Sequence, residues 1–374
     1  MKNDLSCYDP YDIWKTSMGI SVKKLFYRNK YLGIIPAGLL SFFDLYLNNT
    51  NRLFYIKQEY PITRAQASLA LINLYIKTNE KNYLTHARHH IDWLLENTSK
   101  GFNGLSWGTG FKIVISSNLV YDENTPFSTN TPYALEALDK YYQITQESDI
   151  LNAIKSIYEF YEKEILIIHE DNEVLITSYG PFKDRIVTNA VSYTMYAYSI
   201  FYRYMEDSIY IKNKVLKMYS FLKNVQNKNG SWLYAPDNKS FIDCFHSCFV
   251  LKNIIKTNDI IKLKNSDKVI KEGYIFVKRS FFDKKSGLYK RFVIKNKPSL
   301  VKFDLYDNSE MLNVAKLLGD SEVAERLSVS IDKSFFKNKN LYSIVDIFGN
   351  LKNKNTLRWA VMPYILANSQ PCIK

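Results

Sequence analysis

The chain has 374 residues, of which 46% are apolar and 15% are aromatic, so it can bury a large hydrophobic core. Its formal net charge is +13, but the lysines are scattered over helix faces and turns and form neither a basic arm nor an RNA-binding motif. We therefore expect no nucleic-acid partner. Solubility, an anionic lipid surface and an acidic glycan remain as explanations of the charge.

Local sequence features favour a cytoplasmic protein. No run of about 18 uncharged apolar residues is present, so we expect no transmembrane helix. The polar start, MKNDLSCYDPYDIWK, lacks the apolar stretch of a signal peptide. The four cysteines form no CxxC pair and are interpreted as packing residues in a reducing compartment; they are Cys7, Cys244, Cys248 and Cys372.

Helical patterns fill most of the chain. Residues 1–59 contain two helical stretches, within 11–28 and 36–47. From residue 60 onward, helices rich in apolar and small residues alternate with amphipathic, charged helices. The apolar helices are predicted at 62–78, 129–145, 188–204, 242–257, 304–320 and 356–368. The charged helices are predicted at 82–97, 149–165, 210–226, 260–281 and 321–336.

The two kinds of helix form a repeating unit of about 50 to 65 residues, which is typical of helical-hairpin repeats. Short polar turns make the two helices of a unit antiparallel, with the apolar helix inside and the charged helix facing solvent. This predicts an all-α fold, an (α/α)6 toroid or six-hairpin barrel, with short β-like turns at its mouth. Residues 60–374 supply the hairpins, and 1–59 supply a helix that closes the ring, within one structural domain. An open α-solenoid is the alternative.

Polar residues gather where the inner helices begin. Inner helices of a toroid run in one direction, so their N-termini meet at one mouth, where aligned helix dipoles favour an anion. The polar residues at these N-termini are Arg64, Asn130, Asn189, Asp243, His246, Asp304, Asp307 and Arg358. Each alone is explained as a helix cap or a surface residue. Together they predict a shared binding site for an anionic group such as a carboxylate.

Aromatic residues lie in the turns that open at the same mouth. Trp107, Trp232 and Tyr234 follow outer helices, and Trp359 lies at the start of the last inner helix. Aromatic rings stack on the C–H faces of sugars, so we expect these residues to bind a glycan. Packing within the helical core is the alternative.

Motifs of other site classes are missing from the sequence: there is no P-loop, GxGxxG, GxSxG or HExxH. His86, His89 and His90 share one outer helix, and a solvated helix face explains them better than a metal site does. We therefore expect neither a metal nor a cofactor.

A series of weak motifs occurs in a characteristic order. They are YPITRAQASLALINLY, SWGTGF, TNTPYALEALDKYY, TNAVSYTMYAYS, NGSWLY followed by FIDCFHSCFVLKNI, DLYDNSEMLNV and LRWAVMPYILA. Over about residues 60–367 they resemble a bacterial family from surface-polysaccharide biosynthesis clusters, described as VpsJ-like. More distantly, the arrangement is similar to uronyl C5-epimerases and unsaturated-glucuronyl hydrolases. The chain departs from the family pattern at Thr188 and Tyr306, where that pattern has histidines.

The resemblance implies a carbohydrate-active protein of O-antigen, capsule or exopolysaccharide biosynthesis. Its partner would be an oligosaccharide or lipid-linked saccharide, and it would associate peripherally with membrane assembly machinery. Hydrolysis of such a glycan would use a pair of carboxylates from Asp243, Asp304 and Asp307.

Lyase or C5-epimerase chemistry would instead move the proton next to a uronate carboxylate. His246 or Tyr306 would act as acid or base, and Arg64 or Arg358 would hold the carboxylate. The alternative to an enzyme is a non-catalytic glycan-binding or assembly factor on the same scaffold. A prenyl-lipid enzyme would need a DxDD or DDxxD cluster, which the sequence lacks.

Overall fold

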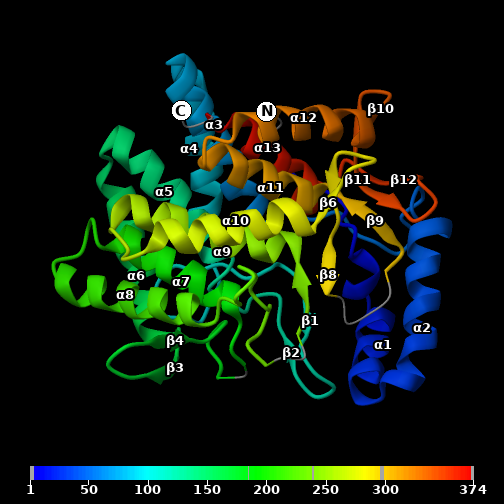
Figure 1. Cartoon of the computed structure of the whole chain (residues 1–374), viewed down its shortest axis with the longest axis horizontal. Coiled ribbons are helices and arrows are strands. Elements are labelled where there is room, and N and C mark those ends of the chain that lie inside the picture. The colour runs from blue at the N-terminus through cyan, green and yellow to red at the C-terminus, as the bar shows by residue number, and fades with distance from the viewer. Residues whose placement is uncertain (1–3, 184, 238–239, 295–298, 372–374) are drawn as a thin grey trace.

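The computed structural model describes residues 4–183, 185–237, 240–294 and 299–371, which form mainly helices arranged around a ring (Figure 1). Six inner helices follow one another around this ring; each contacts the next, and the last contacts the first. They are α3 (Pro61–Thr78), α5 (Thr131–Thr145), α7 (Thr188–Phe201), α9 (Cys244–Ile260), α11 (Leu305–Leu317) and α13 (Met362–Ser369), the last continuing the π-helix η3 (Leu357–Val361). The ring is closed, so the predicted α/α toroid is confirmed and an open solenoid is excluded.

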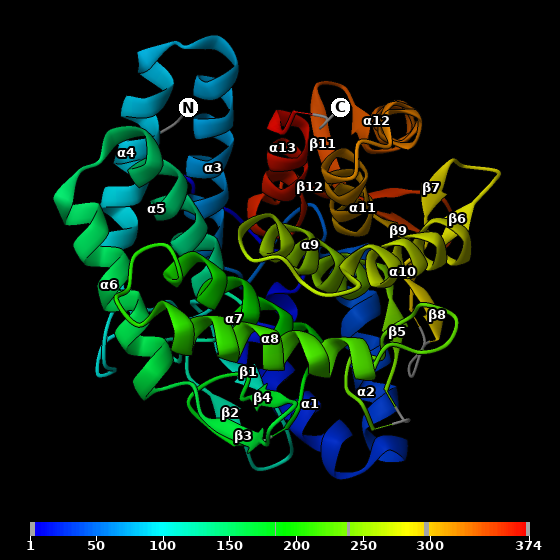
Figure 2. The ribbon, with the colours of Figure 1, turned by 60° about the vertical axis from the view of Figure 1, so that its left-hand side comes forward.

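Five of the described helices lie outside this ring, each beside an inner helix (Figure 2). They are α4 (Lys81–Glu96), α6 (Ser148–Lys163), α8 (Ser208–Asn224), α10 (Ser266–Ser280) and α12 (Ser321–Phe335). The burial of the two layers follows their composition. Every residue of α7 is buried, whereas α6 buries only one stripe, from Ile150 through Ile154 and Ile157 to Tyr161. An apolar helix therefore forms the inner layer and an amphipathic helix the outer one.

Short antiparallel strands lie at the ends of the hairpins. They are β1 (Ile113–Val114), β2 (Val120–Tyr121), β3 (Ile167–Glu170), β4 (Leu175–Thr177), β5 (Ile242–Asp243), β6 (Phe282–Asp283), β7 (Leu288–Tyr289), β8 (Phe292–Ile294), β9 (Val301–Asp304), β10 (Phe336–Lys337), β11 (Asn340–Asp346) and β12 (Leu351–Lys354). β5 pairs with β8 and β9 with β11. Because β5 leads directly into α9 and β9 into α11, these pairings fix Asp243 and Asp304 at the starts of two inner helices.

The N-terminal segment forms η1 (Asp12–Lys15), α1 (Ser17–Arg28), α2 (Lys30–Phe42) and the π-helix η2 (Phe43–Leu47). We predicted that one of these helices would supply the sixth outer helix, beside the last inner helix. Helix α1 packs instead on α2, η1 and β1, while the inner circle closes through the contact of α13 with α3 (Figure 1). The α1–α2 hairpin therefore lies beside the strands of the mouth and not in the outer layer. That 1–59 and 60–374 fold as one domain stays a prediction.

Within the described part of the chain, one helix is apolar and long enough to cross a membrane by length and composition: Lys30–Leu47, with a mean hydropathy of 1.2 and 17% of its residues buried. The search for an uncharged run missed this segment because Asp44 interrupts it.

Buried ion pairs link inner helices across the ring. The ammonium group of Lys252 on α9 lies 2.7 Å from the carboxylate of Glu310 on α11, and that of Lys256 lies 2.6 Å from Glu136 on α5. Both carboxylates and Lys252 are at most 4% exposed. Such pairs compensate the cost of burying charged groups inside the ring.

Candidate active site

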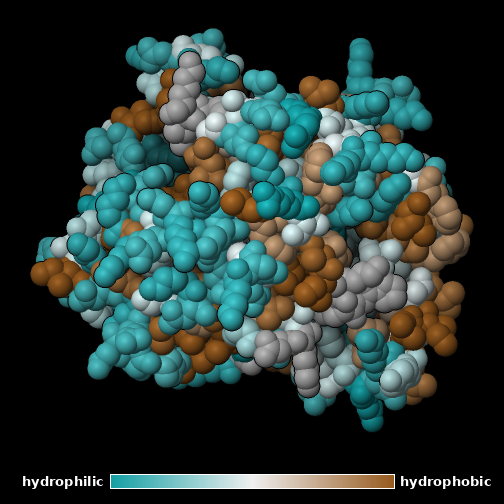
Figure 3. All heavy atoms as spheres, in the orientation of Figure 1, coloured by the Kyte–Doolittle hydropathy of each residue, from teal (hydrophilic) through white to brown (hydrophobic). Residues whose placement is uncertain are grey.

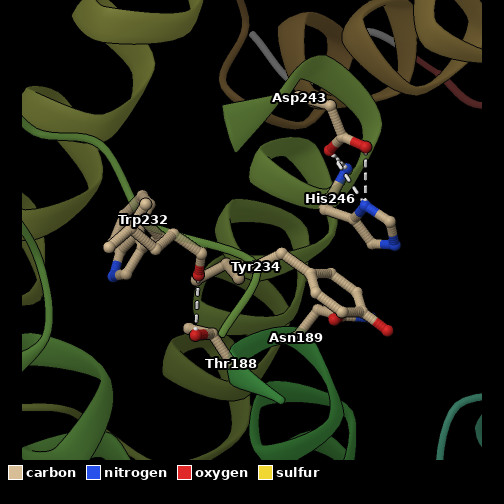
Figure 4. Close-up of a pocket in the computed structure, with 8 residues that line it drawn as sticks. Thr188, Asn189, Trp232, Tyr234, Asp243 and His246 are labelled. Carbon is tan, nitrogen blue, oxygen red and sulfur yellow. Dashed lines mark hydrogen bonds and ion pairs between the residues drawn. The ribbon is translucent and has the colours of Figure 1, made fainter. Parts of the chain in front are cut away.

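Asp243 and His246 form a hydrogen-bonded pair at the start of α9. The Asp243 carboxylate caps the helix by accepting a hydrogen bond from the backbone nitrogen of His246 at 3.1 Å. It also lies 2.8 and 2.9 Å from the imidazole Nδ1 of His246 (Figure 4). With Nδ1–H donated to the carboxylate, Nε2 is the ring nitrogen left for a ligand. The Asp243 side chain is 2% exposed and that of His246 is 20% exposed, so only the histidine can meet a substrate.

A small pocket opens beside His246, with a cavity volume of about 10 Å³, which is room for about one water molecule. It is lined by Thr188, Asn189, Trp232, Leu233, Tyr234, Asp243, His246 and Val250. The Oδ1 atom of Asn189 is buried and has no hydrogen-bond partner among the described residues. A buried acceptor of this kind is costly unless a ligand or water satisfies it. Thr188, in contrast, donates its hydroxyl to the Leu233 carbonyl at 2.8 Å, which anchors the turn.

Aromatic rings surround the imidazole of His246. The ring of Phe245 lies 4.0 Å away between centroids and the ring of Tyr234 lies 4.7 Å away, edge-on. Phe241 and Phe249 complete the enclosure at 5.8 Å each. These contacts fix the imidazole and exclude water from most of its surface, which strengthens its interaction with Asp243.

Asp304 and Asp307, predicted as catalytic carboxylates, are completely buried. Asp304 accepts hydrogen bonds from the Trp359 indole at 2.9 Å and from Arg291 at 3.3 Å. Asp307 accepts one from the backbone of Phe245 at 3.1 Å, and Arg291 lies 3.8 Å from its other oxygen. Burial raises the pKa of both carboxyl groups despite the nearby guanidinium. Both aspartates therefore hold the mouth together and do not face the pocket.

Arg291 was missed by sequence reasoning because it lies in the turn between β7 and β8 without any motif around it. Its guanidinium group packs over the rings of Phe245 and Trp359, 5.0 and 5.2 Å from their centroids. It also donates to the hydroxyl of Tyr11 at 2.8 Å. One buried cation thus connects α9, α11, η3 and the N-terminal segment.

The two arginines predicted to hold a substrate carboxylate are paired with carboxylates of the chain itself. Arg64 lies 2.6 Å from Glu59, and Arg358 bonds the fully buried Asp9. Arg64 also lies 2.9 Å from Nδ1 of His90, which is 1% exposed. Our interpretation of His90 as a solvated residue was wrong. Burial and the nearby arginine lower its pKa to about 3, so it stays neutral and accepts the hydrogen bond.

Two of the predicted sugar-binding tryptophans have a structural role. The indole of Trp107 donates to the Leu94 carbonyl at 2.9 Å, and that of Trp232 donates to the Leu222 carbonyl at the same distance. Both side chains are buried, although Trp232 forms one wall of the pocket. In these two repeats the tryptophan therefore anchors a turn to the outer helix that precedes it, α4 or α8.

Trp359 belongs to the buried cluster beside the pocket, where it stacks on Tyr306 with 4.5 Å between centroids and 20° between planes. Asn130 precedes α5 and makes no side-chain cap. The predicted site residues that the structure brings together around one pocket are Asn189, Trp232, Tyr234, Asp243 and His246. The other predicted site residues do not line this pocket; they are Arg64, Trp107, Asn130, Asp304, Tyr306, Asp307, Arg358 and Trp359. No group of three His, Cys, Asp or Glu side chains in the described ranges is placed to hold a metal ion.

Comparison with known structures identifies the class of fold. The chain is similar to a cellobiose 2-epimerase from Bacillus thermoamylovorans B4167, with a TM-score of 0.65 and 15% identity over 83% of this chain and 86% of that one. A D-mannose isomerase matches with a TM-score of 0.60 and 13% identity, over 83% and 86% of the two chains. A family 105 glycoside hydrolase from C. acetobutylicum ATCC 824 matches with a TM-score of 0.60 and 12% identity, over 83% of this chain and 93% of that one.

All three comparisons place the chain in the α/α-toroid fold class. No protein-family model and no curated protein matches the sequence, so the likeness is one of fold.

Proposed function

We propose that the protein is a sugar-converting enzyme in which His246 transfers a proton and Asp243 orients its imidazole. The observation that carries this proposal is that His246 lines the pocket, whereas two of the aspartates predicted as catalytic carboxylates do not. The free Nε2 of His246 belongs to the pocket, whereas Asp304 and Asp307 are sealed behind Arg291 and Trp359. Among the residues that the structure describes, no pair of carboxylates of the kind that glycosidic hydrolysis uses lines this pocket.

The reaction supported best is removal of a proton from a carbon next to a carbonyl or carboxylate group. Nε2 of His246 would take this proton. In an epimerisation the planar intermediate would then turn over in the pocket, and the imidazolium would return the proton to the opposite face of the same carbon. In an elimination, the electron pair left on the carbon would instead expel the 4-linked oxygen. The solved structures similar to this chain include an epimerase, an isomerase and a polysaccharide lyase, which are named for conversions of these kinds.

We further propose a uronate-containing glycan of bacterial surface-polysaccharide biosynthesis as the substrate, free or lipid-linked, in the cytoplasm. The VpsJ-like motif order and the net charge of +13 support this assignment. Arg185, which the sequence did not single out, is exposed and lies 5.7 Å from the ring of Tyr234, at the edge of the pocket. It is better placed than Arg64 or Arg358 to attract an acidic sugar.

A non-catalytic glycan-binding factor is the second candidate, and one observation favours it. The N-terminal segment covers the centre of the mouth. Asp9 forms an ion pair with Arg358, and Tyr11 accepts a hydrogen bond from Arg291 and packs edge-on against Trp359.

The deciding experiment incubates the purified protein with reducing disaccharides and uronate oligosaccharides in D2O, followed by mass spectrometry and NMR. Deuterium on a sugar carbon without cleavage is the expected result, and its absence in His246→Gln would assign it to this residue. An unsaturated product would show elimination. Cleavage of a glycosidic bond with addition of water would contradict our proposal and show that the protein is a hydrolase. Binding of a saccharide without any conversion would favour the non-catalytic factor.

A further inference from the structure

Helix α2 presents a stripe of large apolar side chains to solvent. Its exposed members are Tyr31 (87%), Leu32 (64%), Ile35 (68%), Leu39 (66%) and Phe42 (50%). Leu32, Ile35, Leu39 and Phe42 follow one another at intervals of three or four residues, and Tyr31 lies four residues before Ile35, so all five share one face of the helix. Figure 3 shows hydrophobic residues over the part of the surface where α2 lies in Figure 1. Contiguous exposed apolar surface of this kind marks an interaction site.

The stripe continues beyond the helix. The ring of Tyr46 in η2 lies 5.0 Å from that of Phe42 and 6.1 Å from that of Phe348, which is 72% exposed. The last residue of η2, Leu47 (64%), and the loop after it add further exposed residues: Leu53 (54%), Phe54 (85%) and Ile56 (81%). Phe54 is also held at φ 69°, a left-handed conformation that is costly for a bulky residue and is typical of functional positions.

The charge of this region is strongly asymmetric. Between Thr16 and Gln58 the sequence has six Lys or Arg residues and a single acidic residue, Asp44. Asp44 is only 5% exposed and accepts a hydrogen bond from the hydroxyl of Tyr55, so it adds little negative charge to the surface. Arg28, Lys30 and Lys57, in contrast, are exposed. An apolar stripe with a cationic border complements a bilayer of anionic lipids.

We propose that the α1–α2 hairpin and the loop 47–56 dock on an anionic lipid surface. Helix α2 lies along the interface, with its stripe among the headgroups and upper acyl chains, while Arg28, Lys30 and Lys57 meet lipid phosphates. The helix does not span the bilayer, because its other face is packed against α1. A Cβ atom on Gly33 would lie 2.3 Å from the Cα of Phe26, so the two helices are in close contact.

Docking in this way places the lipid surface beside the mouth of the toroid, because α1 also packs on η1 and on β1. The inference does not depend on the proposed sugar chemistry. It concerns a different surface, and its test measures no conversion of a sugar.

The test is co-sedimentation of the full-length protein with vesicles of phosphatidylcholine alone or mixed with phosphatidylglycerol. We expect binding to the anionic vesicles to be about tenfold or more tighter, and to weaken with salt. The triple variant Leu32→Ser, Ile35→Ser, Leu39→Ser should lose binding about tenfold or more. The matched control is Ile76→Ser, Ile209→Ser, Val329→Ser, whose residues are 63%, 75% and 68% exposed on other helices. It should bind like the unmodified protein.

A second variant, Arg28→Glu with Lys30→Glu, tests the charge without touching the stripe, and should lose the preference for anionic vesicles. Circular dichroism confirms that all variants are folded. The proposal is overturned if the unmodified protein binds neither vesicle, or if the control variant loses binding as strongly as the stripe variant. It is also overturned if sedimentation velocity shows a dimer that only the stripe substitutions dissociate, without vesicle binding. The stripe would then be an interface between two copies of the chain.

Discussion

The hydroxyl group of Tyr11 lies 2.8 Å from a guanidinium nitrogen of Arg291, a residue 280 positions further along the chain. The ring of Tyr11 also packs edge-on against Trp359, with 4.8 Å between centroids. Arg291 in turn holds the buried carboxylate of Asp304. The N-terminal segment is therefore part of the mouth, and a substrate must bind beside it or displace it.

Removing the Tyr11 contacts should destabilise the protein in two steps. Tyr11→Phe keeps the ring on Trp359 and loses only the hydrogen bond, so we expect the free energy of unfolding to fall by about 1 kcal/mol. Tyr11→Ala loses the ring as well and should lower it by about 3 kcal/mol. Urea denaturation measures both values. Equal, negligible effects would contradict a fixed N-terminal segment.

Replacement of His246 tests the proposed acid or base directly. His246→Gln should slow deuterium incorporation into the sugar by about 100-fold or more. Of the other titratable side chains that line the pocket, Tyr234 has a pKa raised by burial and Asp243 is only 2% exposed. The melting temperature should change little, since the side chain lies at the edge of the core. His169→Gln is the matched control: this histidine is 53% exposed on the β3–β4 hairpin, and its replacement should leave the rate unchanged.

Asp243→Asn separates helix capping from orientation of the imidazole. Asparagine caps a helix as well as aspartate does, so the free energy of unfolding should stay within about 1 kcal/mol. The rate of proton transfer should fall about tenfold or more, because a neutral amide holds the imidazolium less well than a carboxylate. Asp207→Asn at the start of α8 is the control, since Asp207 makes the same backbone cap without a histidine. An unchanged rate in Asp243→Asn would remove Asp243 from the mechanism.

Asp307→Asn distinguishes proton transfer by His246 from hydrolysis by carboxylates. Burial raises the pKa of Asp307, which shifts its carboxyl group towards the neutral form that asparagine imitates. We expect sugar conversion to stay within about threefold and the free energy of unfolding within about 1 kcal/mol. Loss of all conversion with normal stability would restore Asp307 as a catalytic residue.

Asp44 should make stability depend on pH in the acidic range. Burial raises the pKa of its carboxyl group from 3.8 to about 6, so the folded state prefers the protonated form. Its contribution is fully present below about pH 4 and is lost as the pH rises to 6, by about 3 kcal/mol in total. Asp44→Asn cannot ionise and should lack this loss. Its stability relative to the unmodified protein should therefore increase between pH 4 and 6 in urea titrations, and a constant difference would contradict the assignment.

By itself, the sequence determined the architecture of this protein. The alternation of apolar and charged helices predicted a toroid, because an apolar helix must be buried and an amphipathic helix must lie at the surface. The sequence also located Asp243 and His246, since their spacing of three residues at a helix start places both side chains on one face. These features depend on neighbours within a few residues, which a sequence shows directly.

Tertiary structure alone decided which of the other polar residues face a substrate. Arg64 meets Glu59, Arg358 meets Asp9, and Asp304 meets an arginine from a turn without any motif. The sequence placed Arg64, Arg358 and Asp304 at the mouth but did not show their partners, because electrostatic pairing depends on distances between segments that can lie far apart in the chain. The same reason kept the exposed stripe of α2 hidden: an apolar helix looks alike in sequence whether another helix covers it or not.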